Sequence, residues 1–184
     1  MKQYLLIFLT LLSTHLHAQK ITAANIDSFD LAVQKRLADR IGKPLQNFTA
    51  TMEGQPISNE TLKGKIVFIN FWFEACEPCV AEFESLDSLY QKLKDNKNFE
   101  FIAFTFEEPG KLAALKKKYK LLYHLVSVSQ TDCYRLNQNN GFPTSIIIDA
   151  NGIIKYIHTG GFTEKEKVEE FMMKEVYPAI VKEL

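Results

Sequence analysis

The sequence predicts an α/β sandwich in which helices flank a mixed central sheet, with a small β-hairpin before it. Two apolar runs, Lys65–Phe73 and Phe99–Phe106, are rich in β-branched and aromatic residues, as in strands buried on both faces. Apolar residues at helical spacing follow each run, and an antiparallel hairpin at Asn151-Gly152 precedes the last helix. With 184 residues, the chain can form one domain with a sizeable core.

The N-terminus has the pattern of a secretory signal peptide. A positive start with Lys2 precedes an apolar run, Tyr4–Leu12, which is too short for a membrane helix of about 20 residues. We expect residues 1–18 to be cleaved after Ala18, although Leu16 stands where a small residue is usual. An uncleaved anchor and a buried N-terminal helix are the alternatives. The protein is therefore expected in the cell envelope or periplasm.

The charge balance argues against a nucleic-acid partner. The chain has 22 basic and 22 acidic residues and no basic patch. Its three cysteines all lie beyond the signal peptide, and one structural pairing cannot account for an odd number in an exported protein.

Residues 19–41 are predicted to form an amphipathic helix or tether. Its apolar positions recur at spacings of three and four, and Asp27 or Ser28 would start it. These positions are Ile26, Phe29, Val33, Leu37 and Ile41. We expect the helix to pack on the domain or to tether it, rather than to bind a partner. Gly42-Lys43-Pro44 ends the pattern, so the main domain should cover residues 42–184.

The main domain begins with a hairpin and its central strand. Phe48–Met52 and Gln55–Ser58 flank Glu53-Gly54, a turn signal. Lys65–Phe73 is the central strand. The segment Glu77–Lys94 follows, with apolar residues on one helical face.

The second half alternates strands and helices before the final hairpin. After the strand Phe99–Phe106, Pro109-Gly110 opens a helix over Lys111–Tyr119, and a short strand, His124–Val128, comes next. A short helix is expected at Asp132–Asn137.

The C-terminal part should be a hairpin and a helix. Thr144–Asp149 and Ile153–His158 are its strands, joined through Asn151-Gly152. Thr163 and Glu166 are spaced as a capping box for the last helix.

Cys76-Glu77-Pro78-Cys79 is the candidate active site. It follows the central strand and opens a helix, where free N–H groups and the helix dipole favour a thiolate. Two thiols at this spacing can close and open a disulfide without a metal or organic cofactor. Cys76, nearer the helix N-terminus, should be the exposed nucleophile, and Cys79 the resolving thiol. A static structural disulfide and half of a zinc site are the alternatives.

The sequence around this motif resembles the thioredoxin superfamily. The shared features are Gly64-Lys65, Asn70-Phe71-Trp72, the paired cysteines and Gly141-Phe142-Pro143-Thr144. More narrowly, the chain resembles the TlpA/ResA group of exported thiol–disulfide oxidoreductases over roughly residues 42–182. Two positions depart from that pattern: Ala75 stands where Trp is common, and Cys133 is additional.

The resemblance implies roles for further residues. Pro143 would be a cis proline beside the disulfide, leaving the backbone of Phe142 free to pair with a substrate strand. Glu82 would exchange protons or control the cysteine pKa values, its alternative being a solvated helix carboxylate. Asn70 stands where cytoplasmic thioredoxins place a buried acid, and Trp72 would pack beneath the active-site loop. Asn70 and Trp72, together with Glu77 and Pro78, are expected to support the active site.

Cys133 lies outside the motif. We expect a small buried hydrophobe, with a regulatory thiol as the alternative.

These features predict an exported enzyme that reduces protein disulfides. The acids Glu74, Glu77 and Glu82 disfavour a thiolate, and no Lys, Arg or His lies between Ile66 and Lys92 to offset them. The resemblance implies a membrane-embedded thiol electron donor and substrates that include apocytochromes awaiting haem attachment. No cofactor and no metal are expected.

Two other functions are considered. A peroxiredoxin-like (AhpC/TSA-type) peroxidase expects a Thr three residues and a Pro seven residues before its reactive cysteine, where this chain has Phe73 and Ile69. A non-enzymatic metal-binding thiol module of this fold favours a wider cysteine spacing.

Overall fold

The computed structural model describes residues 23–184, so the expected signal peptide, residues 1–18, lies outside the described residues. Its contacts divide the chain into one unit that ends at Gln34 and a second unit, Lys35–Leu184. Within residues 23–184, no helix is both long enough and apolar enough to cross a membrane.

The expected N-terminal helix is present with different ends. Helix α1 covers Ala23–Ala38, so it begins before Asp27 and Ser28. Ile41 lies beyond the helix and is 43% exposed, because the chain turns at Gly42, whose φ is +79°. The prediction that the amphipathic helix continues to Ile41 is therefore wrong, because the helix ends at Ala38.

The predicted hairpin and mixed sheet are confirmed. Strands β1 (Thr49–Met52) and β2 (Gln55–Ser58) form a separate antiparallel pair. The main sheet has the strand order β5-β4-β3-β6-β7, in which β4 pairs parallel with both β3 and β5, and β6 pairs antiparallel with both β3 and β7. Its strands are β3 (Ile66–Phe71), β4 (Phe99–Thr105), β5 (His124–Ser127), β6 (Thr144–Ile148) and β7 (Ile154–Thr159).

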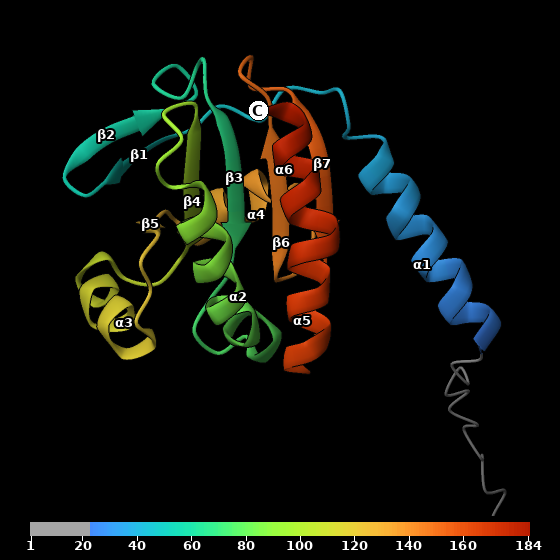
Figure 1. Cartoon of the computed structure of the whole chain (residues 1–184). Helices are drawn as coiled ribbons and strands as arrows, with labels where there is room; N and C mark the ends of the chain where they lie inside the picture. The colour runs from blue at the N-terminus through green and yellow to red at the C-terminus, as the bar shows by residue number, and fades with distance from the viewer. Residues whose placement is uncertain (1–22) are drawn as a thin grey trace, which may run out of the picture. The chain divides into compact units, whose positions relative to one another are not determined.

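Helices cover both faces of this sheet (Figure 1). Helices α2 (Glu77–Leu93) and α5 (Lys165–Phe171) share one apolar core with the inward side chains of β3 and β4. Helix α4 (Gln130–Leu136) lies on the other face. Helix α3 (Leu112–Tyr119) follows a short 3-10 turn, Pro109–Lys111. This layering places the carboxyl end of β3 directly before the start of α2.

Two helix starts differ from the sequence prediction. Helix α4 begins at Gln130, since the hydroxyl of Ser129 accepts a hydrogen bond from the N–H of Asp132. The capping box at Thr163 and Glu166 is wrong. The cap position belongs to Glu164, and the Thr163 hydroxyl donates to its carboxylate instead.

The last helix is interrupted. A π-helical stretch, Met172–Val176, separates α5 from α6 (Tyr177–Glu183). Pro178 accounts for it, because a proline inside a helix has no N–H to donate to the preceding turn.

Candidate active site

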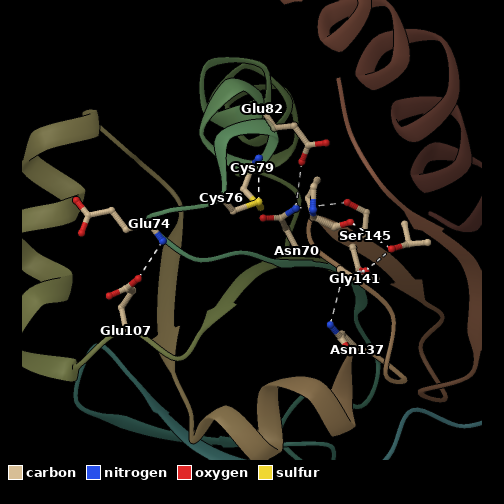
Figure 2. The surroundings of a disulfide bond; sticks show 12 residues. Asn70, Glu74, Cys76, Cys79, Glu82, Glu107, Asn137, Gly141 and Ser145 are labelled. Atoms are coloured by element: carbon tan, nitrogen blue, oxygen red, sulfur yellow. Dashed lines mark hydrogen bonds between the residues drawn. A yellow bond between two sulfur atoms is a disulfide. The ribbon is translucent and has the colours of Figure 1, made fainter. Parts of the chain in front are cut away.

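The two cysteines form a disulfide at the start of α2 (Figure 2). Strand β3 leads directly into this turn, and the Trp72 N–H still pairs with the Phe104 carbonyl at 3.1 Å. Cys76 is the N-cap residue, and its Sγ accepts a hydrogen bond from the Cys79 N–H at 3.3 Å. The Cys79 N–H thus points at the sulfur of Cys76, where it and the helix dipole would stabilise the thiolate of the reduced protein.

Cys76 is the more accessible cysteine, but it is not exposed. Its exposure is 6%, against 1% for Cys79. The expectation of an exposed Cys76 is therefore wrong for the disulfide form, in which its sulfur is bonded to Cys79 over the first helical turn. The order of accessibility still matches the roles expected for the two thiols.

A cis proline lies in the same site. The Phe142–Pro143 peptide bond is cis, as the resemblance implied. Pro143 is buried, and its carbonyl accepts the N–H of Gly160 at 2.9 Å, which brings the loop after β7 to the site. An ideal Cβ on Gly161 would lie 2.8 Å from Pro143 Cγ and 2.9 Å from Glu82 Oε1. Pro143 and Glu82 therefore meet at Gly161.

Glu82 is a buried acid and not a solvated helix carboxylate. It is 2% exposed, and burial raises its pKa to about 8, although the amide of Asn70 opposes that rise. Asn70 Nδ2 lies 3.5 Å from both Glu82 Oε2 and Ser145 Oγ (Figure 2). Glu82 is therefore mostly protonated at neutral pH, and it lies on α2, the helix whose first turn holds the cysteine pair.

The remaining predicted support residues surround this centre. Trp72 is fully buried under the loop, with its ring edge-to-face against Phe83 at 5.0 Å. Pro78 is half-buried in the first turn of α2, and Glu77 is exposed beside it.

The charge distribution differs from the sequence prediction in two respects. The negative charge of Glu74 is compensated by Lys118 of α3, which forms a 2.7 Å ion pair with it. The structure also adds an acid, since Glu107 Oε1 accepts the N–H of Glu74 at 2.9 Å (Figure 2). Both contacts join segments more than thirty residues apart, so spacing along the chain gave no sign of them.

Cys133 lies buried on α4 as a free thiol. Burial raises its pKa to about 12, so it is not a nucleophile at neutral pH. Within residues 23–184, no three His, Cys, Asp or Glu side chains gather as a metal site would require.

Sequence reasoning missed two parts of the site. Gly161 stands in a loop with no motif, and only the contact with Pro143 and Glu82 identifies it. Phe106 and Tyr134 were treated as ordinary parts of a strand and a helix, yet both rings lie within 6 Å of the Phe142 ring.

A CxxC disulfide at the N-terminus of a helix, together with a cis proline and a buried acid in this mixed α/β sandwich, defines a thioredoxin-fold thiol–disulfide oxidoreductase. The model of the AhpC/TSA family matches residues 41–157. The chain belongs to this family and, within it, to the ResA-like thiol–disulfide oxidoreductases.

Individual relatives support this assignment. The chain is 36% identical over 138 residues to the thiol-disulfide oxidoreductase ResA of Halalkalibacterium halodurans, covering 72% of this chain and 76% of that protein. It is 35% identical to ResA of Bacillus cereus, covering 73% and 78%. Among solved structures, the thioredoxin domain of a thiol-disulfide oxidoreductase from Bacteroides vulgatus matches with a TM-score of 0.57 and 25% identity, covering 71% of this chain and 96% of that one.

Proposed function

We propose that this protein is an exported enzyme that reduces disulfide bonds in other proteins. The observation that carries the proposal is the Cys76–Cys79 disulfide at the N-cap of α2, next to cis Pro143 and the protonatable Glu82. Export rests on the signal-peptide pattern of residues 1–18. Residues 19–41 would then be a tether or packing helix, and residues 42–184 the catalytic domain.

The reaction uses both thiols in turn. In the reduced protein, the Cys76 thiolate attacks one sulfur of a substrate disulfide and releases the other as a thiolate. Cys79 then attacks Cys76 in the mixed disulfide, which frees the second substrate thiol and restores the Cys76–Cys79 bond. Each cycle transfers two electrons to the substrate.

Glu82 supplies and removes the proton of Cys79 in this scheme. As an acid with a pKa of about 8, it is protonated in the oxidised protein at neutral pH. When an electron donor attacks Cys76, Cys79 leaves as a thiolate and takes that proton. In the forward reaction, the Glu82 carboxylate accepts the proton back as Cys79 attacks.

The mode of substrate binding is inferred from the backbone at Phe142, and the need for an electron donor from the oxidising compartment. Phe142, before the cis proline, would pair with an extended substrate segment. A reductant in an oxidising compartment needs its own electron supply, for which a membrane-embedded thiol donor is proposed, and apocytochromes are candidate substrates.

The reduction potential tests the direction of electron flow. Glu77 and Glu107 still disfavour a thiolate at Cys76, so we expect a potential nearer to the roughly −270 mV of thioredoxin than to the roughly −120 mV of a strong oxidase. Equilibration with glutathione buffers would measure it. A value above about −180 mV, that of protein disulfide isomerase, would make the protein an oxidase or isomerase instead.

A further inference from the structure

Four aromatic rings form a continuous cluster beside the disulfide. Phe142 packs edge-to-face against Phe73 at 5.3 Å, against Tyr134 at 5.3 Å and against Phe106 at 5.8 Å. Phe73 stacks on Phe106 at 5.3 Å. The rings come from four separate segments: the loop before α2, the loop after β4, helix α4 and the loop before β6. We call these four residues the aromatic cluster.

The aromatic cluster lies at the surface. Tyr134 is 40% exposed and the other three rings are half-buried, although rings of this size are mostly covered elsewhere in the domain. Rigid aromatic rings that pack on one side and face water on the other are typical of the anchor points of interfaces. Nothing in the catalytic scheme requires Phe106 or Tyr134.

The aromatic cluster is continuous with the reacting atoms. The Phe73 carbonyl accepts the N–H of Cys76 at 3.1 Å, and Phe142 directly precedes the cis proline. A polypeptide whose cysteine bonds to Cys76 and whose backbone pairs with Phe142 would lie within reach of these rings. A bulky apolar side chain next to that cysteine would cover them and leave water.

The charges around the aromatic cluster indicate which further side chain a bound polypeptide segment would carry. A hollow of about 560 Å³ begins at Phe106 and is lined by Glu107 and Glu108 together with Ser127 and Ser129. Neither glutamate forms an ion pair with any Lys, Arg or His among residues 23–184. A cationic side chain entering the hollow would meet two carboxylates and the ring of Phe106.

We propose that the aromatic cluster docks the substrate segment that carries the attacked disulfide. The segment presents a bulky apolar side chain next to its cysteine and a lysine or arginine beyond it. This inference deepens the proposed function and rests on it.

Single-turnover reduction of designed peptides by the pre-reduced protein tests the proposal. The peptides share one intrachain disulfide and differ in the residue beside a cysteine, Phe or Ser, and in a residue farther along, Lys or Glu. We expect the Phe peptides to react at least tenfold faster than the Ser peptides. We also expect the Lys peptides to react about threefold faster than the Glu peptides at low salt, with a smaller gap at high salt.

Variants connect these preferences to the structure. Tyr134→Ala should reduce the Phe-over-Ser ratio several-fold, and Glu108→Gln should reduce the Lys-over-Glu ratio. Leu122→Ala is the matched control, because Leu122 is 50% exposed and lies outside the aromatic cluster, so both ratios should keep their parental values.

The outcomes separate the two proposals. A reduced parent protein that reacts with none of the peptides overturns the proposed function and the docking proposal with it. Equal rates for Phe and Ser peptides, or a ratio unmoved by Tyr134→Ala, overturn the docking proposal alone. A changed oligomeric state in Tyr134→Ala with unchanged ratios would assign the rings to a contact between copies of the chain, and would also overturn it.

Discussion

A side chain on Gly161 would collide with Glu82: its Cβ would lie 2.9 Å from Glu82 Oε1 and 2.8 Å from the ring of Pro143. Real Cβ atoms do not approach other heavy atoms this closely. The loop after β7 can therefore cover the buried carboxyl group only because residue 161 has no side chain. Gly161 therefore lies against both the buried acid, Glu82, and the cis proline, Pro143.

Gly161→Ala should release Glu82 from this enclosure. The proline ring is rigid and buried, so the carboxylate is the group that can move, and it would gain water. We expect a loss of roughly 1–3 kcal/mol in unfolding free energy from overpacking, and a Glu82 pKa closer to its ordinary value. Denaturant unfolding and NMR titration of the carboxyl carbon measure these two effects.

Gly141→Ala is the control for that substitution. Gly141 is in the same site, but its added Cβ would meet only Thr159 Oγ1, at 4.0 Å, an ordinary contact. Its effect on stability should stay within about 0.5 kcal/mol. Equal effects of the two substitutions would contradict the role assigned to Gly161.

Glu82→Gln should change how stability depends on pH. Burial raises the folded-state pKa of Glu82 to about 8 from 4.5, so the folded protein holds this proton more tightly than the unfolded chain does. The contribution of the protonated acid is complete below about pH 4.5 and is lost as the pH rises to about 8. Between these values, the parent should lose up to about 1.4 kcal/mol per pH unit relative to the variant.

Urea unfolding of both proteins across this pH range measures the difference. Glu84→Gln is a suitable control, because Glu84 lies on the same helix with a side chain that is 73% exposed. Its stability should run parallel to that of the parent. Parallel curves for Glu82→Gln as well would mean that Glu82 is charged in the folded protein.

The sequence sufficed for the strands and for the position of the two cysteines. Long apolar runs predict β3 and β4, because a strand that is buried on both faces needs apolar residues along nearly its whole length. Turn residues mark both hairpins: Glu53-Gly54 is a two-residue turn with two positive φ values, and Gly152 has the positive φ in the longer connection between β6 and β7. Helix ends were less predictable: the N-cap position of α5 falls at Glu164, one residue after the Thr163 that the capping pattern marks.

The rest of the site depends on contacts across the chain. Lys118 and Glu74 are 44 residues apart, and the aromatic cluster combines four segments. Local spacing carries no information about such pairs, because the folded sheet creates them. Helical spacing does place Glu82 on the face of Cys79 and Leu86, but an acid among apolar neighbours is normally solvated, and only the folded loop at Gly161 shows that it is covered.

The charges near Cys76 should adjust its reduction potential in opposite directions. Glu77 is exposed in the first turn, so Glu77→Gln removes a negative charge and favours the thiolate. An exposed charge contributes no more than about 1 kcal/mol and 30 mV corresponds to about 1.4 kcal/mol, so we expect a potential roughly 10–20 mV more oxidising. Lys118→Gln frees the charge of Glu74 and should shift the potential the other way. Shifts of the same sign in both variants would exclude this account of the site.

The attack order predicts different fates for the two cysteine variants. Cys76 has the helix-capping sulfur and the greater exposure, so Cys76→Ser should abolish disulfide reduction. Cys79→Ser keeps the nucleophile but cannot resolve the mixed disulfide, so it should accumulate as a covalent adduct with one substrate molecule. Mass spectrometry after mixing with a disulfide-bonded protein detects that adduct, and reductant should release it.

Cys133→Ala is the control. The Cys133 thiol is buried and has a pKa of about 12, so its removal should leave turnover unchanged. Full turnover by Cys79→Ser would show that a single thiol suffices, and the two-thiol mechanism would then be wrong.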